Sequence, residues 1–198
     1  MSANHAAFNL IFRFIENYVS PIAGRISSQR HVMAIRDGFI SAMPFMIVGS
    51  FLLVFAYPPF SPDTTWGFAR GWLDLAKQYE GRILTPFDMT MGIMSIYICA
   101  AIAYNLGKHY AKSYQLDPFM CAMLSLMAFL LVAAPKTSGT LPVDSLGGTG
   151  IFTAILVAIY CVEMMRFLKA HNIGIRLPDQ VPPMIKNSFD LLIPVLVV

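Results

Sequence analysis

Residues 38–57 read GFISAMPFMIVGSFLLVFAY, a run of twenty positions without Asp, Glu, Lys, Arg or His. An α-helix rises about 1.5 Å per residue, so a run of this length crosses a hydrocarbon layer of about 30 Å. One charged side chain at the centre of such a helix would cost roughly 2.5–3.5 kcal/mol on insertion, which offsets several leucines. The run therefore predicts a transmembrane helix over residues 38–57.

Three further runs have the same character, because residues 89–107, 118–135 and 145–162 also lack charged residues and histidine. A fifth apolar run begins within residues 189–198 and stops at Val198. Over the whole chain 57% of residues are hydrophobic and 13% are charged, whereas soluble domains carry roughly 25% charged residues. We therefore expect an all-α, polytopic membrane protein with four full transmembrane helices and a truncated fifth.

Two segments outside these runs have an amphipathic pattern. In residues 5–20 apolar side chains recur at helical spacing, which predicts a helix on the inner membrane surface. A helix that packs on the rest of the fold fits that pattern equally well. Residues 64–82 predict an outer interfacial helix, in which Trp66, Trp72 and Tyr79 anchor the chain at the membrane surface rather than contact a ligand. Residues 171–188 are rich in proline and predict an irregular inner segment.

The basic residues are unevenly divided between the segments that connect the spans. Cytoplasmic loops of membrane proteins are enriched in Lys and Arg. If the N-terminus is cytoplasmic, ten of the fourteen Lys and Arg residues of this chain lie on the inner side: Arg13, Arg25, Arg30, Arg36, Lys108, Lys112, Arg166, Lys169, Arg176 and Lys186. The outer side then carries four: Arg70, Lys77, Arg82 and Lys136. We therefore predict that the N-terminus is cytoplasmic.

The fourth span carries a stripe of small residues. Gly150, Ala154 and Ala158 recur every four positions and share one helix face. Such a stripe lets a second helix approach closely, and that helix could belong to this chain or to a second subunit. In the first span, Pro44 is expected to kink the helix.

The spans offer no acid, base or imidazole group for catalysis or metal binding, because Asp, Glu, Lys, Arg and His are absent from them. The histidines lie outside the spans at spacings unsuited to one metal ion: His5, His31, His109 and His171. The cysteines lie within apolar runs, where a thiol packs as a small hydrophobic group: Cys99, Cys121 and Cys161. We predict no catalytic residue, no metal site, no cofactor and no nucleic-acid partner.

Two stretches of sequence are more specific than the hydropathy pattern. The first is RHVMAIRDGF at residues 30–39, which runs into MPFMIVGSFLL at residues 43–53. The second is LPDQVPP at residues 177–183, followed by NSF at 187–189 and LIP at 192–194. Together they resemble the IIC permease components of the bacterial sugar phosphotransferase system, of the lactose/cellobiose (N,N'-diacetylchitobiose) type.

The resemblance covers essentially the whole chain, but only the N-terminal half of such a permease. It implies a homodimeric component of the bacterial inner membrane that takes up a β-linked disaccharide of the cellobiose, chitobiose or lactose type, by an elevator-like shift of one domain. A separate IIB component, working with IIA, phosphorylates the sugar, so the chain is not itself the enzyme. Residues 1–198 would form the scaffold and dimer interface, in contact with membrane lipid.

The sugar-binding His and Glu of that family are expected in the C-terminal half. The substrate-binding residues are therefore unknown, and we expect this chain to be inactive alone. Arg36, Asp37, Pro44 and residues 177–183 are interpreted as structural. An alternative from another class is a non-transporting membrane scaffold or assembly fragment. An unrelated small transporter or membrane enzyme is disfavoured, because the spans lack polar functional groups.

Overall fold

The computed structural model describes residues 16–17, 20–133, 143–174 and 180–198. Their helices are α2 (Ser20–Ser27), α3 (Arg30–Ala56), α4 (Gly67–Asp88), α5 (Met94–Tyr114), α6 (Pro118–Ala133), α7 (Ile151–Ala170), α8 (Pro183–Asp190) and α9 (Leu192–Val197), with short 3₁₀ turns at Val143–Ser145 and Gly148–Gly150. No β-strand occurs in this part of the chain. The amphipathic helix predicted for residues 5–20 lies outside the described residues except for positions 16, 17 and 20.

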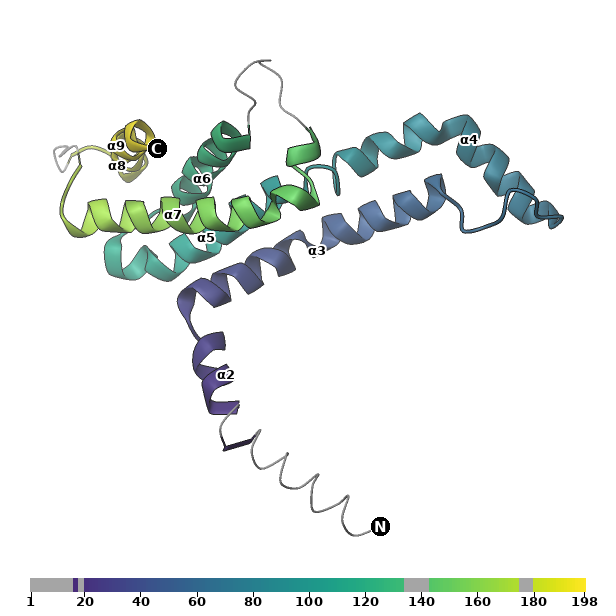
Figure 1. Cartoon of the computed structure of the whole chain (residues 1–198). Helices are drawn as coiled ribbons and strands as arrows, with labels where there is room; N and C mark the ends of the chain where they lie inside the picture. Colours follow the sequence, from purple (N-terminus) through teal and green to yellow (C-terminus); the bar gives the residue numbers. More distant parts are fainter. Residues whose placement is uncertain (1–15, 18–19, 134–142, 175–179) are drawn as a thin grey trace, which may run out of the picture.

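Helix α5 is the centre of the bundle, and it contacts α3, α6 and α7 (Figure 1). Its buried positions recur in adjacent pairs at helical spacing: Met94, Ser95, Ile98, Cys99, Ile102, Ala103, Leu106, Gly107 and Tyr110. A stripe of pairs is wide enough to face more than one neighbour, whereas a single row of apolar residues covers only one. This width explains why α5, rather than a more apolar helix, occupies the centre.

Small residues set the distance between the helices. Gly38 of α3 lies so close to α5 that an added Cβ would stand 2.4 Å from Cγ1 of Ile102 and 3.0 Å from its backbone nitrogen. Ala154 and Ala158 of α7 are fully buried in the same core. The small-residue stripe of the fourth span therefore packs within this chain.

The C-terminal part of α3 forms, together with α4, an arm that extends beyond the bundle (Figure 1). Ala69 and Ala76 of α4 are buried, and the indole nitrogen of Trp72 donates a hydrogen bond of 3.2 Å to the carbonyl oxygen of Phe55. The helix predicted over residues 64–82 is present, but it begins at Gly67 and continues to Asp88. It includes Pro86, which the last turn accommodates.

Three other predicted boundaries differ from the structure. The helix predicted from residue 89 begins at Met94, because the chain first turns at Gly92, where a Cβ would lie 2.5 Å from the carbonyl oxygen of Asp88. The helix predicted from residue 145 begins at Ile151, after the 3₁₀ turn. The irregular segment predicted over residues 171–188 is wrong in its last part, since α8 begins at Pro183. Proline is well tolerated there, because the first helical residue needs no backbone N–H.

Two of the described helical segments are long and apolar enough to cross a membrane by length and composition, Arg30–Ala56 and Gly148–Ala170. The helix Pro118–Ala133 is apolar but shorter. The number of spans therefore stays a prediction. Helix α3 is the more exposed of the two, because only 17% of its most apolar window is buried.

The approach of α3 to α5 gives a direct test. Gly38→Ala should lower the free energy of unfolding by about 1–3 kcal/mol, because the added methyl overpacks the contact with Ile102. Gly81→Ala is the matched control, since a Cβ at this α4 position meets nothing within 4 Å, and it should stabilise by about 0.5–1 kcal/mol. Thermal unfolding of both variants in detergent measures the difference. Equal effects of the two substitutions would contradict the packing argument.

Candidate functional site

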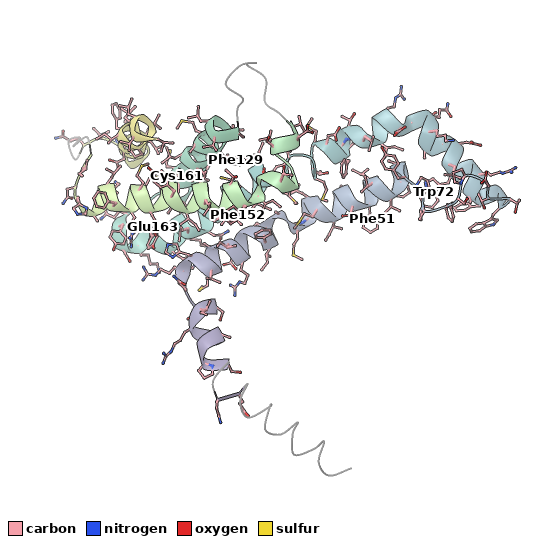
Figure 2. The ribbon with its side chains drawn as sticks, viewed as in Figure 1. Phe51, Trp72, Phe129, Phe152, Cys161 and Glu163 are labelled. Atoms are coloured by element: carbon pink, nitrogen blue, oxygen red, sulfur yellow. The ribbon has the colours of Figure 1, made fainter. Side chains whose placement is uncertain are left out.

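The most connected polar group of the described residues is Glu163, near the C-terminal end of α7 (Figure 2). One oxygen, Oε1, accepts a hydrogen bond of 2.7 Å from the Tyr110 hydroxyl and lies 2.8 Å from Nε2 of His31. The other oxygen, Oε2, lies 2.7 Å from Nη2 of Arg166. The carboxylate thus joins the start of α3, the end of α5 and the end of α7.

Two arginines lie against the ring of Tyr110. The guanidinium carbons of Arg30 and Arg166 are 5.5 Å and 5.2 Å from its centroid, and Arg166 is also 5.8 Å from the ring of Tyr114. These distances are typical of cation–π contacts. We call Arg30, His31, Tyr110, Glu163 and Arg166 the basal cluster.

The environment of Tyr110 keeps its hydroxyl protonated. Tyr110 lies past the charge-free run 89–107. Burial raises the pKa of Tyr110, and its hydrogen bond to Glu163 raises that pKa further, although Arg166 and Arg30 oppose this. The hydroxyl is therefore a stable hydrogen-bond donor to Glu163 at neutral pH. The cluster is suited to holding three helix ends together, and not to proton transfer by Tyr110.

A second ionic contact lies near the same end of α7, where Lys169 pairs with Asp190 of α8. Beside this pair is a cavity of about 140 Å³, lined by Met165, Leu168, Lys169, Asn172, Ile173, Gly174, Asp190 and Pro194. Pockets for small organic ligands usually measure about 300–1,000 Å³. The cavity is therefore too small to hold a disaccharide.

A larger hollow of about 720 Å³ lies on the α3–α4 arm, lined by Phe55, Phe68, Gly71, Trp72, Leu75, Ala76, Tyr79 and Ile83. A sugar site needs side chains that hydrogen-bond to its hydroxyl groups. In this groove the indole N–H of Trp72 is already bonded to the backbone, and charged side chains are absent from the lining. The groove fits apolar chains better than a sugar.

The residues discussed from sequence lie in several places, and His31 belongs to the basal cluster. The three cysteines are buried in the bundle core, and the Arg36 side chain pairs with its neighbour Asp37 at 2.8 Å. Trp72 and Tyr79 line the groove of the arm. Within the described ranges, no three His, Cys, Asp or Glu side chains are arranged to hold a metal ion. Sequence reasoning missed the basal cluster, because its members are separated by 53 and 132 positions along the chain.

Most of the chain matches a known protein family. A family model described as "Phosphotransferase system, EIIC" matches residues 36–198. The chain belongs to the EIIC family. This membership and the helical architecture identify it as an α-helical membrane protein, and they confirm the resemblance to the IIC permeases.

Several curated EIIC proteins are similar to this chain. The cellobiose-specific EIIC component of Geobacillus stearothermophilus is 38% identical, over 92% of this chain and 42% of its own length. The lichenan permease IIC component of Bacillus subtilis (strain 168) is 32% identical, over 94% of this chain and 42% of its own length. A lactose-specific EIICB component of Streptococcus mutans is 33% identical, over 88% of this chain and 30% of its own length.

A solved structure is also similar, that of ChbC, the IIC component of the N,N'-diacetylchitobiose-specific phosphotransferase system. It superposes with a TM-score of 0.78 at 33% identity, covering 94% of this chain and 44% of ChbC. The EIIC chain described here thus spans 42% of the length of the first two relatives.

Removing the Glu163 charge should loosen this end of the EIIC bundle. Glu163→Gln is expected to lower the free energy of unfolding by about 1.5–3 kcal/mol, because three donors lose a charged acceptor. Asp37→Asn is the control, since it removes the more exposed pair with the adjacent Arg36, and should cost less than about 1 kcal/mol. Thermal denaturation in detergent compares the variants. A Glu163 variant as stable as the control variant would show that the cluster does not hold the helices together.

Proposed function

We propose that this chain supplies the N-terminal part of an EIIC permease that takes up a β-linked disaccharide in a phosphoenolpyruvate-dependent sugar phosphotransferase system. The observation that carries the proposal is the similarity to ChbC, with a TM-score of 0.78 over 94% of the chain. Relatives named for cellobiose, lichenan, oligo-β-mannoside and lactose support the substrate class, because β-linked hexoses are common to these carbohydrates.

Within such a permease, this part acts as the scaffold. Helix α5 is packed on three helices, and the basal cluster joins three helix ends, so the bundle is suited to remain fixed while another part moves. The two cavities described above are small or apolar, which supports sugar contacts made by residues outside this chain. The chain alone is then inactive in transport.

The chain carries out no phosphoryl transfer in this proposal. Transfer needs a nucleophile that can accept the phosphoryl group, whereas its three cysteines are buried in the core. The partners are IIB and IIA components of the system. Relatives named EIICB, such as the lactose-specific protein of Streptococcus mutans, support cooperation with IIB.

The proposed topology has a cytoplasmic N-terminus, four full spans and the start of a fifth, in the bacterial inner membrane. In this topology the ends of α3, α5 and α7 that carry the basal cluster all face the cytoplasm, together with ten of the fourteen basic residues. Labelling of an Asp63→Cys variant by a membrane-impermeant thiol reagent in intact cells supports this orientation, and protection of that position opposes it.

The chain is also proposed to form a homodimer through the exposed apolar side of α3. Phe51 is 63% exposed and Ile47 and Phe55 are each more than half exposed, and Figure 2 shows Phe51 on the arm beyond the bundle. Large exposed apolar surfaces in membrane proteins face either lipid or another subunit. The arm has a groove and exposed aromatic residues, so its surface can fit a second subunit better than a smooth helix face can.

Transport is tested in cells that lack their own EIIC but retain the other phosphotransferase components. Uptake of labelled cellobiose should stay at the empty-vector level when residues 1–198 are expressed alone, because the sugar contacts lie elsewhere. Uptake should appear when the chain is co-expressed with the C-terminal half of the cellobiose-specific relative. Membrane fractionation verifies insertion in both cases.

Uptake by the 198-residue chain alone would contradict the scaffold role. Insertion without uptake even with the complementary half would favour the alternative of a non-transporting scaffold or assembly fragment.

Dimerisation is tested by cross-linking in membranes. A Phe51→Cys variant should give a covalent dimer with a short bifunctional maleimide, since position 51 would face the partner. Lys112→Cys, at an exposed position near the end of α5, is the control and should remain monomeric. Equal cross-linking at both positions would indicate random collision, and the absence of any dimer would contradict this interface.

A further inference from the structure

We propose that the basal cluster binds the phosphate group of an anionic phospholipid through Arg30 and Arg166. Both guanidiniums lie against the ring of Tyr110. Arginine matches phosphate well, because its planar group offers several N–H donors that can bind two oxygens at once. The cluster therefore presents cationic donors, fixed by one aromatic ring, at a single end of the bundle.

Charge balance leaves this group of side chains positive. Glu163 neutralises Arg166 through their contact of 2.7 Å. Arg30 is exposed, and among the described residues no carboxylate lies within ion-pair distance of it. Its position is nevertheless defined by the Tyr110 ring. Arg30 is thus an oriented cation without an anionic partner in the described part of the chain.

The depth of the cluster favours a lipid over a soluble anion. Tyr110 lies just beyond the charge-free run 89–107, and Glu163 directly follows the run 145–162. This is the level at which headgroups lie when a helix crosses the bilayer. Basic side chains at that level on the cytoplasmic side attract anionic lipids.

The adjoining surface suits acyl chains. Deeper along α3, Val48 lies about five helical turns from Arg30 on the same face of the helix and is 52% exposed, and Ile40 between them is 55% exposed. A lipid whose phosphate contacts Arg30 can lay its hydrocarbon chains along this apolar side of the helix. An acidic protein segment would use the arginines but would leave that surface uncovered. The combination of a cationic end and an apolar side therefore favours a phospholipid.

The test measures lipid retention by the purified 198-residue chain. The protein is delipidated and exchanged into equal amounts of phosphatidylglycerol and phosphatidylcholine in detergent, and bound lipids are counted by native mass spectrometry. The unchanged chain should retain phosphatidylglycerol preferentially. Arg30→Gln should reduce that preference about fivefold, as expected for the loss of one arginine near the lipid surface.

Arg25→Gln is the matched control, because Arg25 is an exposed basic residue of the neighbouring helix α2 and should leave the preference unchanged. Arg30→Lys keeps the charge but loses the planar donor group, so an intermediate loss is expected. Circular dichroism verifies that each variant remains folded.

Equal retention of the two lipids by the unchanged chain would overturn the proposal, and so would equal losses in the Arg25 and Arg30 variants. Displacement of phosphatidylglycerol by millimolar inorganic phosphate would indicate a site for the free anion instead. If Arg30→Gln lowered binding of a purified EIIB protein without changing lipid retention, the surface would serve a protein partner and the lipid assignment would be wrong.

Discussion

The exclusion of charge from hydrocarbon determines where this EIIC fold can place its ionic contacts. A polar group without a partner at membrane depth costs several kcal/mol, and the ion pairs of the described residues lie outside the four charge-free runs. His31, Glu163 and Arg166 meet at one end of the bundle, and Tyr57 bonds to Glu80 at the other end of α3. Between these ends, helices are held by close packing of small residues, because burial from water provides no driving force within lipid.

These two kinds of contact have different roles. Close packing, such as that of Gly38 on Ile102, fixes how near the helices lie. The hydrogen bonds to Glu163 fix the axial position of α3, α5 and α7 relative to one another, because a shift of one helical turn, about 5.4 Å, would break all of them. The bundle needs both the close packing and the hydrogen bonds to Glu163 to hold its helices in one arrangement.

The sequence predicted the helices well where the signal was a property of one segment. Charge-free runs located α3, α5, α6 and α7, and spacing identified Ala154 and Ala158 as a packing stripe. Boundaries were less accurate, since the turn at Gly92 and the 3₁₀ turn before Ile151 depend on contacts between segments. Pro182 and Pro183 indicated irregular structure, whereas they precede and begin a helix. The basal cluster was unpredictable, because nothing local to His31 identifies a partner 132 positions away.

The position of the cluster also bears on the division of labour in the permease. A group that holds a sugar through the membrane would have to be polar at mid-bilayer depth and would have to move with the sugar. Glu163 and its partners lie at the edge of the charge-free runs and tie together three helices, so moving one of them alone would expose a carboxylate without its donors. Such a group resists relative motion of the helices. This resistance is what the proposed fixed scaffold requires, and it supports the proposal that the moving, sugar-binding elements lie outside the bundle that α5 organises.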